Sequence, residues 1–229
     1  MNWYRNRQTA RERYVAKYDA TEAAAYDAFV GNLTAEDEAA YLADMQRVFE
    51  FRCGMQVLDA GAGSGTLSKI LSQVDGLSLT ALEPAPAMLA LLSLKPTLSE
   101  VCYVQGFCDA PEDRDHFHEA HFDAIASRQL VNGLFDPLVA FRNWFHWLKP
   151  GGKVIAIDGF YGRAAWTGMF EPEVDLLPLS ACQSMATMPY LLEKVGFQIE
   201  AVELMTATNK QPATRTTRYV VVASKPVTH

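Results

Sequence analysis

The 229-residue sequence predicts an α/β fold: a doubly wound, mostly parallel seven-stranded sheet with a C-terminal antiparallel hairpin and an N-terminal helical cap. Three observations indicate this class. From residue 55 onward, short apolar runs alternate with helical segments, which is the pattern of strands joined by right-handed crossovers. The first run ends in three closely spaced glycines, where a helix begins. The last two runs are joined by a polar stretch without a helical pattern, so we expect those strands to pair antiparallel.

The first fifty residues are polar and aromatic and predict helices outside the alternating core. Thr9–Tyr18 contains few helix breakers. Thr34 is a good N-cap residue, acidic residues follow it, and Ala39–Phe51 continues in a helical pattern. Gly31 and Asn32 separate the two segments.

The remaining strands and helices follow in order along the chain. Each expected strand is a short apolar run, and two helices end at glycine-containing stop signals, at Pro150-Gly151-Gly152 and at Gly196. The expected strands are Met55–Ala60, Leu77–Glu83, Glu100–Gln105, Phe122–Ser127, Lys153–Asp158, Phe197–Leu204 and Thr217–Ala223. The expected helices are Thr66–Val74, Pro86–Leu94, Pro137–Leu148 and Met188–Val195.

Composition and charge narrow the class of function. The chain has 20 Lys and Arg against 27 Asp and Glu, a net charge of −7, which argues against nucleic acid as its main ligand. Apolar runs such as Leu89–Leu94 are too short to span a bilayer, and the N-terminus lacks the apolar region of a signal peptide. Four cysteines without a CxxC pair are typical of a reducing compartment. We therefore expect a cytoplasmic protein with no membrane partner.

The segment Asp59–Gly65 (DAGAGSG) predicts a ligand-binding turn between a strand and a helix. Glycines there permit positive φ angles and let a ligand approach the backbone, while a helix N-terminus attracts an anion. The nicotinamide fingerprint would need a third glycine at position 66, which is Thr66. An acid beside the turn suits a zwitterion, with its amine on Asp59 and its carboxylate on the backbone. The alternative is a tight turn without a ligand.

Glu83 ends the second expected strand, 18 residues after Gly65. In doubly wound sheets a ligand lies at the carboxyl ends of the strands, and an acid at this position can accept hydrogen bonds from both hydroxyls of a ribose. Alone, a glutamate at a strand end is weak evidence. Together with the glycine turn, it predicts a site for a nucleoside.

With these two motifs in place, the chain resembles the class I S-adenosylmethionine-dependent methyltransferases of the small-molecule type, over roughly residues 10–225. Further segments match that family in the right order. They are Tyr14–Asp19 (YVAKYD), Phe107–Ala110 (FCDA), Phe122–Arg128 (FDAIASR) and Leu148–Val154 (LKPGGKV). The resemblance implies a Rossmann-like methyltransferase fold, S-adenosyl-L-methionine as cofactor and S-adenosyl-L-homocysteine as product. It implies a cofactor site formed by Asp59, Gly61, Gly63, Gly65, Glu83, Pro84, Met88, Cys108, Asp109, Ala110, Ser127 and Tyr18.

The resemblance also implies how a single domain, 1–229, is organised: residues 1–50 as helical cap or lid, 51–159 as cofactor-binding half, and 160–229 as acceptor lid and hairpin. One departure concerns the residues after the fourth strand, Arg128–Gly133 (RQLVNG), where many relatives have a histidine. The resemblance therefore supplies no histidine base. It supports methyl transfer by SN2 displacement to a small-molecule acceptor, most simply at oxygen or nitrogen.

The acceptor pocket should be formed by the cap, the end of the fourth strand and the long segment Gly159–Pro189. That segment is rich in aromatic and thioether side chains, which suits a planar or apolar acceptor with a polar group; half of them could instead cover the sheet. They are Phe160, Tyr161, Trp166, Met169, Phe170, Met185 and Met188, with Tyr190 directly after the segment.

We expect catalysis mainly through proximity and orientation, without a dedicated base. In this hypothesis Tyr18 packs near the sulfonium, while Arg128 and Tyr161 hold the acceptor. Arg128 and Arg163 could meet an acidic group on the acceptor; alternatively, Arg128 pairs with a neighbouring carboxylate and only braces the strand end.

Other interpretations remain open. His116, His118 and His121 could ligate a metal, but a solvated surface helix is the better interpretation, and we expect no metal site. A cofactor-binding regulatory protein without turnover, a protein or RNA methyltransferase, and a nicotinamide oxidoreductase are the alternative functions. The absence of an (N/D)PPY motif after the fourth strand argues further against nucleic acid as acceptor. We expect a monomer or a homodimer.

Overall fold

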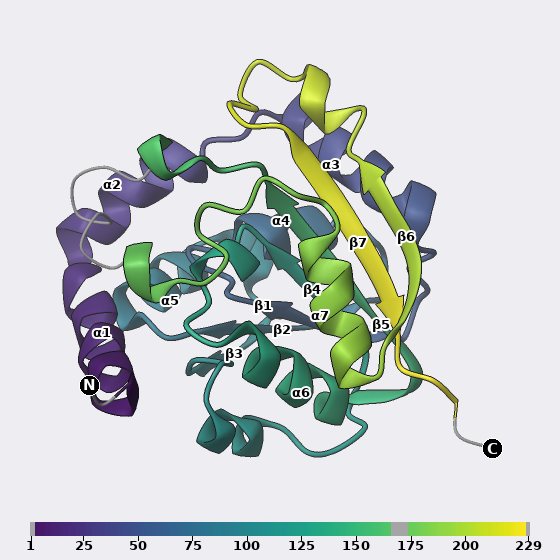
Figure 1. Ribbon diagram of the computed structural model, residues 1–229. Coiled ribbons are helices and arrows are strands. Elements are labelled where there is room, and N and C mark those ends of the chain that lie inside the picture. The colour runs from purple at the N-terminus through teal and green to yellow at the C-terminus, as the bar shows by residue number, and fades with distance from the viewer. Residues whose placement is uncertain (1–2, 166–173, 228–229) are drawn as a thin grey trace.

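A seven-stranded sheet lies between two layers of helices in the computed structural model, which describes residues 3–165 and 174–227 (Figure 1). The strand order across the sheet is β3-β2-β1-β4-β5-β7-β6. The strands are β1 Gln56–Ala60, β2 Ser78–Glu83, β3 Cys102–Gln105, β4 Phe122–Arg128, β5 Leu148–Gly159, β6 Gln198–Leu204 and β7 Arg218–Ser224. The α-helices are α1 Trp3–Lys17, α2 Ala20–Val30, α3 Ala35–Val48, α4 Thr66–Leu71, α5 Pro86–Ser93, α6 Pro137–Trp147 and α7 Thr187–Val195.

The sheet has the mixed topology that the sequence predicts. β1 pairs in parallel with β2 on one side and with β4 on the other. β7 inserts between β5 and β6 and is antiparallel to both. The chain therefore reverses its winding direction between β1 and β4, and the carboxyl ends of these two strands border the crevice where ligands bind in doubly wound folds.

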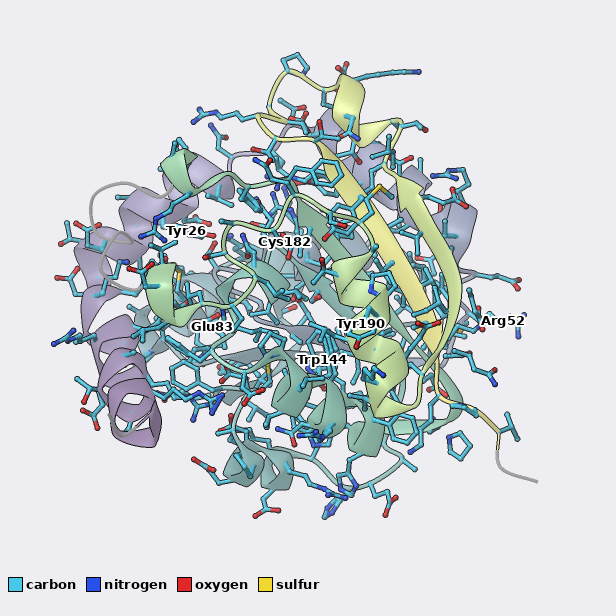
Figure 2. All side chains as sticks on the ribbon, in the orientation of Figure 1. Tyr26, Arg52, Glu83, Trp144, Cys182 and Tyr190 are labelled. Atoms are coloured by element: carbon cyan, nitrogen blue, oxygen red, sulfur yellow. The ribbon has the colours of Figure 1, made fainter. Side chains whose placement is uncertain are left out.

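The two faces of the sheet are covered by different helices. Because successive side chains of a strand point to opposite faces, neighbouring residues of one strand pack against different helices. Val57, Ala124 and Ile155 pack in the core formed with α3 and α4. Leu58, Ile125 and Val154 alternate with them and pack with α6 and α7 on the opposite face. Trp144 on α6 is fully buried there, while Tyr190 on α7 is exposed (Figure 2).

Three N-terminal helices precede the sheet, and α1 and α2 lie together at the left of Figure 1. Asp19 separates α1 from α2 as an N-cap, because its carboxylate accepts hydrogen bonds of 2.9 Å from the N–H groups of Thr21 and Glu22. The predicted cap at Thr34 is also present, since Thr34 and Asp37 form a reciprocal capping box at the start of α3.

Several element boundaries differ from the prediction. α4 ends at Leu71 instead of Val74, and β5 begins at Leu148 instead of Lys153, so the Pro150-Gly151-Gly152 segment lies inside a strand. Non-local pairing explains the longer strand. Leu148 is the register partner of Phe122 on β4. Gly151 N–H donates to the Lys225 carbonyl at 2.8 Å, and Lys225 N–H donates to the Gly152 carbonyl at 2.9 Å. Gly151 adopts a φ of 78°, which lets the chain bend without leaving the ladder.

Within the part of the chain that the structure describes, every helix is too short or too polar to cross a bilayer.

Candidate active site

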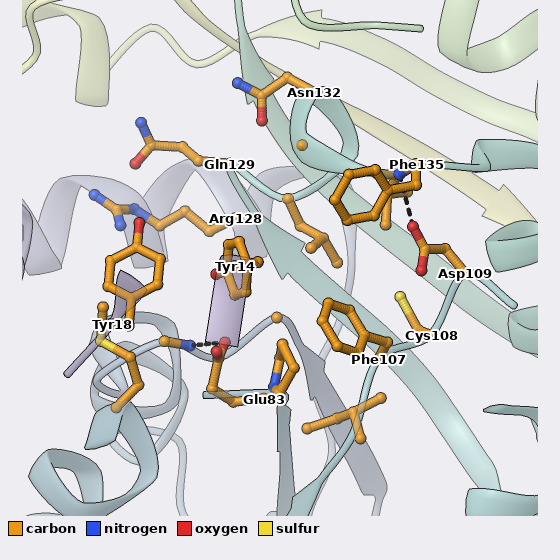
Figure 3. Close-up of a pocket in the computed structure, with 18 of the residues that line it drawn as sticks. Tyr14, Tyr18, Glu83, Phe107, Cys108, Asp109, Arg128, Gln129, Asn132 and Phe135 are labelled. Carbon is orange, nitrogen blue, oxygen red and sulfur yellow. Dashed lines mark hydrogen bonds between the residues drawn. The ribbon is translucent and has the colours of Figure 1, made fainter. Parts of the chain in front are cut away.

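A cavity of about 380 Å³ lies at the carboxyl ends of β1, β2 and β4. The glycine turn, the ends of these strands and the loop after β3 form one wall, and residues of α1 and α2 form the other. Figure 3 shows labelled residues of this lining. The described residues that line it are Tyr14, Lys17, Tyr18, Tyr26, Phe29, Val30, Gly61, Gly63, Leu82, Glu83, Pro84, Met88, Gly106, Phe107, Cys108, Asp109, Arg128, Gln129, Leu130, Asn132, Gly133, Leu134, Phe135, Tyr161 and Leu177.

The glycine turn has the conformation that its spacing predicts. Gly61, Gly63 and Gly65 adopt φ angles of 68°, 55° and 92°, which side chains with a Cβ rarely tolerate. A Cβ at Gly61 would come within 2.6 Å of Leu130, and one at Gly65 within 2.8 Å of Leu98, whereas a Cβ at Gly63 would meet nothing within 4 Å. Gly63 therefore faces open space, and the other two glycines permit close packing behind it.

The N–H groups of this turn are largely bonded within the chain. Gly61 and Ala62 donate to the Leu82 carbonyl at 2.9 and 3.0 Å, and Gly65 donates to the Ala62 carbonyl at 2.9 Å. Gly63 donates to Oε2 of Glu83 at 3.0 Å. These N–H groups are therefore not free to bind a ligand, and the turn contributes mainly the open space at Gly63.

Glu83 is buried at the end of β2 and lines the cavity. Its two carboxylate oxygens accept from the N–H groups of Gly63 and Ala85, at 3.0 and 2.9 Å. Burial raises the pKa of Glu83 to about 7, although both hydrogen bonds favour the charged form. The carboxylate is thus held in place at the cavity wall, next to the glycine turn (Figure 3).

Asp59 lies behind the turn and is not among the residues that line the cavity. Its carboxylate accepts a hydrogen bond of 2.7 Å from the hydroxyl of Ser68 on α4, and burial raises its pKa to about 7. Asp59 shares the sheet face of Val57, two residues earlier, which packs in the core with α4. Three further predicted cofactor residues, Gly65, Ala110 and Ser127, also lie outside the lining, whereas Pro84 and Met88 belong to it.

The loop after β3 brings Phe107, Cys108 and Asp109 to the cavity. Asp109 accepts from Nη2 of Arg11 at 2.8 Å and from the Phe135 N–H at 2.6 Å. Arg11 also lies 4.2 Å from the ring centre of Phe107 and pairs with Asp113. This arginine on α1 therefore joins the cap to the loop, a long-range contact that local sequence patterns do not indicate.

Three tyrosines of the cap close the other side of the cavity. Tyr18 packs edge-on against Tyr14, with 5.0 Å between ring centres, and against Tyr26, at 5.6 Å. Burial raises the pKa of Tyr14 well above its usual value and that of Tyr26 in the same direction, so both phenols are neutral at pH 7. The predicted residue Tyr18 therefore lies in the cavity wall, accompanied by Tyr26, which belongs to none of the sequence motifs.

The end of β4 places Arg128 and Gln129 at the cavity. Gln129 has a φ of 56°, unusual for a residue with a side chain, and its Nε2 donates to the Tyr161 hydroxyl at 2.8 Å. Nη1 of Arg218 donates to the same hydroxyl. The structure thus brings the predicted residues Arg128 and Tyr161 together, and it adds Gln129 and Arg218 as partners of Tyr161.

Several other residues considered in the sequence do not reach the cavity. Arg163 is 60% exposed and pairs with Asp175. Phe160 stacks on Tyr219, Met188 is buried with α6 and α7, and Tyr190 is exposed. Trp166, Met169 and Phe170 lie outside the described residues. His116 ends a short 3₁₀ helix, Pro111–His116, and 117–121 is not helical, so the predicted surface helix of the histidines is wrong.

Comparisons with known proteins agree with this geometry. The model of the family described as "Methyltransferase domain" matches residues 58–156. Ubiquinone biosynthesis O-methyltransferase of Xylella fastidiosa is 35% identical over 101 residues, which is 44% of this chain and 40% of that protein. Phosphoethanolamine N-methyltransferase 1 of Triticum aestivum is 29% identical over 109 residues, 48% of this chain and 22% of that protein.

Among solved structures, phosphoethanolamine N-methyltransferase 2 of Haemonchus contortus, in complex with S-adenosyl-L-methionine, superposes with a TM-score of 0.67 at 22% identity. The match covers 92% of this chain and 58% of that one, and it concerns the fold. The chain matches less than half the length of its curated relatives. The family model, the strand order and the glycine turn followed by Glu83 all agree: residues 58–156 match the methyltransferase domain family, and the fold is that of the class I S-adenosylmethionine-dependent methyltransferases.

Proposed function

We propose that this protein is an S-adenosylmethionine-dependent methyltransferase that transfers a methyl group to a small-molecule acceptor by SN2 displacement. The observation that carries the proposal is the cavity bounded by the glycine turn, the Glu83 carboxylate and residues 106–109, with tyrosines closing it. The matched relatives are named for N-methylation of phosphoethanolamine and for O-methylation in ubiquinone biosynthesis. Their names support nitrogen or oxygen as the atom that is methylated.

The residues around the cavity fit the cofactor. Open space over Gly63 would receive its methionine part, and the fixed carboxylate of Glu83 would accept hydrogen bonds from its two ribose hydroxyls. Cys108 and Asp109 would border the adenine, and Met88 and Pro84 would pack on it. Asp59, Gly65, Ala110 and Ser127 lie behind these groups, and their contact with the cofactor stays a prediction.

When bound, S-adenosylmethionine supplies a methyl group on a positively charged sulfur. The chain's own task is then to align the acceptor with that methyl group and to exclude water. Tyr18 and Tyr26 form an aromatic wall whose π faces attract a cation. Arg128 and Tyr161 border the same space and would hold the acceptor. Tyr18, Arg128 and Tyr161 are therefore the proposed catalytic residues.

Titration calorimetry of the full chain with S-adenosylmethionine, and separately with NAD, tests the cofactor assignment. We expect saturable binding of the first ligand alone. Turnover is then followed as formation of S-adenosylhomocysteine with a panel of small amines, phenols and carboxylic acids. Binding without turnover on any acceptor, together with turnover on protein or RNA, would assign the chain to macromolecular methylation.

A cofactor-binding regulatory protein without turnover is the second candidate from the sequence, and no specific contact in the cavity favours it. The cytoplasmic location and the monomeric or homodimeric state stay predictions as well. Both follow from sequence composition and family resemblance, and size-exclusion chromatography with light scattering tests the second.

A further inference from the structure

Within the part of the chain that the structure describes, two arginines beside the cavity, Arg128 and Arg218, lack a carboxylate partner, in contrast to the two buried arginines of the cap. Arg7 pairs with Asp136, and Arg11 with Asp109. Among the residues that the structure describes, no carboxylate lies within 4.0 Å of the guanidinium of Arg128 or Arg218. Nε of each is buried without a hydrogen-bond partner.

The two arginines lie on the same face of the sheet, at one end of it. Arg128 is two residues beyond Ala126 on β4, and Arg218 is two residues before Val220 on β7; both of these reference residues pack in the core with α3. The Arg128 guanidinium lies 5.0 Å from the ring centre of Tyr41 on α3. Strand β5 runs between β4 and β7, so the two side chains lie on either side of its carboxyl end.

Gly159, at that end of β5, makes room for Arg218. It is the register partner of Arg218, and a Cβ in its place would come within 2.4 Å of Nη1. The guanidinium instead crosses this position and donates to the hydroxyl of Tyr161, whose ring centre lies 5.4 Å away. Tyr161 and Arg128 both line the cavity. The positive charge of Arg218 is therefore directed toward the cavity through Tyr161.

A buried guanidinium without a counter-ion is unfavourable, because desolvation is not offset by an ion pair. Two buried acids, Asp158 and Asp59, interact electrostatically with Arg218 and Arg128, but neither forms an ion pair with them. The Oδ2 of Asp158 accepts from the Asn132 N–H at 2.9 Å and its Oδ1 from the Gly159 N–H at 2.8 Å. Burial raises the pKa of the nearby phenols of Tyr26 and Tyr161 above the usual value, so neither supplies a negative charge at neutral pH. The end of the cavity near β4 is thus positively charged in a chain whose net charge is −7.

We propose that the acceptor carries a carboxylate or phosphate group, which the Arg128 guanidinium and the Tyr161 hydroxyl bind directly. Arg218 and Gln129 are positioning residues that hold Tyr161 toward this anion. Guanidinium groups bind both kinds of anion through paired N–H donors, which explains an arginine at the cavity without an acid of the protein beside it. The inference rests on the proposed function, because it names the class of molecule that this methyltransferase would methylate.

Calorimetry with simple anions tests the proposal without knowledge of the acceptor. Inorganic phosphate and benzoate are titrated separately into the full chain saturated with S-adenosylhomocysteine, at ionic strength fixed with sodium chloride. We expect saturable binding of at least one anion, and the better of the two identifies the group. Arg128→Gln should weaken this binding about tenfold or more, since it removes a charge-assisted contact, and change the affinity for S-adenosylhomocysteine less than about twofold.

Arg142→Gln is the matched control, because Arg142 is exposed on α6; it should bind like the wild type. Arg218→Gln should weaken anion binding while Arg218→Lys restores most of it, which a merely structural role would not produce. The proposal is overturned if neither anion binds saturably, or if Arg128→Gln binds the anion like the wild type. It is also overturned if Arg128→Gln weakens only S-adenosylhomocysteine, since Arg128 would then serve the cofactor's own carboxylate.

Failure of the proposed function gives a different result. A wild-type chain that does not bind S-adenosylhomocysteine contradicts the methyltransferase proposal. Titration of the same anions into the ligand-free chain and into Arg128→Gln then still decides whether the arginine pair binds an anion.

Discussion

Arg11 on α1 and Asp109 after β3 form a buried ion pair, with 2.8 Å between Nη2 and Oδ1, although 98 residues separate them in the chain. The same guanidinium covers the ring of Phe107. Because Phe107 and Asp109 line the cavity, the pair holds the N-terminal cap against the wall that we expect to flank adenine. The position of the cap and the shape of the cofactor site are thereby coupled.

The first prediction is that Arg11→Gln releases the cap. Removing one partner of a buried ion pair is strongly destabilising, by about 3–5 kcal/mol. Because Arg11 lies on α1 at the edge of the molecule, we expect the substitution to weaken the packing of this helix first. Hydrogen exchange should show faster exchange of the amides of Arg11–Tyr18 in the variant than in the wild type. In the wild type, S-adenosylhomocysteine should protect the same amides, as a lid over the cofactor requires.

Arg13→Gln is the control for this experiment, since Arg13 is exposed on the same helix and its replacement should leave exchange unchanged. Equal exchange of α1 with and without S-adenosylhomocysteine in the wild type would argue that residues 1–30 are a fixed part of the domain.

The second prediction concerns Gly63, the glycine of the turn that faces open space. Gly63→Val should weaken S-adenosylmethionine binding by several kcal/mol, because a branched side chain would occupy the space proposed for the methionine part. A valine is also strained at the φ of 55° found there, so the control must carry the same strain. Gly54→Val does so, at a φ of 86° with nothing within 4 Å, outside the cavity. Equal affinities of the two variants in calorimetry would exclude Gly63 from the cofactor site.

The third prediction is that Glu83→Ala weakens S-adenosylmethionine binding through the loss of two charge-assisted hydrogen bonds, each worth ~1.5–3 kcal/mol. The substitution also leaves the N–H groups of Gly63 and Ala85 without their acceptor, so the melting temperature should fall. Affinity is therefore compared at a temperature where circular dichroism shows both proteins folded. Wild-type affinity under those conditions would make Glu83 a structural residue only.

The sequence was sufficient for the parts of the fold that local chemistry determines. The glycine spacing predicts the turn of Gly61–Gly65 because positive φ angles are a property of single residues. Alternation of apolar runs and helices likewise predicts the sheet and its final antiparallel pair. The Lys153 boundary was wrong because residues 148–152 join the strand through non-local pairing, of Leu148 with Phe122 and of Gly151 and Gly152 with Lys225.

The candidate site was predictable only in part, for the same reason. Glu83 and Tyr18 could be assigned from motifs, and both line the cavity. The placement of Asp59 behind the turn depends on strand alternation combined with knowledge of which face α4 covers. The contacts of Arg11 with Asp109 and of Arg218 with Tyr161 join distant segments, and a single sequence without an alignment gives no signal for them.

The fourth prediction is that the stability of the ligand-free protein decreases as pH rises from about 5 to about 7.5. Burial raises the pKa of Glu83 to about 7, from a usual value near 4.5, so the folded state binds more protons than the unfolded state between these values. Its contribution to stability is therefore present at low pH and is lost as pH rises through 7. Asp59, with a pKa of about 7, acts in the same direction.

Urea unfolding at several pH values measures this dependence. Glu83→Gln should flatten the slope of unfolding free energy against pH, because the neutral amide does not titrate. The slope is the quantity to compare, since the amide NH₂ also displaces one accepting oxygen and shifts the absolute stability. An unchanged slope in Glu83→Gln would mean that Glu83 titrates normally in the folded protein.

The last prediction is that no single side chain acts as an essential base. Asp158 is bonded to the N–H groups of Asn132 and Gly159 and does not line the cavity, and His146 contacts Arg114 on the outer side of α6. Burial raises the pKa of Tyr14, Tyr26 and Tyr161 in the cavity wall, so these phenols are neutral at pH 7. Proximity and orientation must then supply most of the rate, as they can for an acceptor that is already ionised or an amine that is free at the working pH.

Steady-state kinetics of single variants tests this expectation. Arg128→Ala and Tyr161→Phe should lower kcat/KM for the acceptor while cofactor affinity stays nearly unchanged. Asp158→Asn, His146→Gln and Tyr18→Phe should each lower kcat by less than about 10²-fold. A loss of about 10⁴-fold from any one of these replacements, with fold and cofactor binding preserved, would identify a true base and contradict the proximity mechanism.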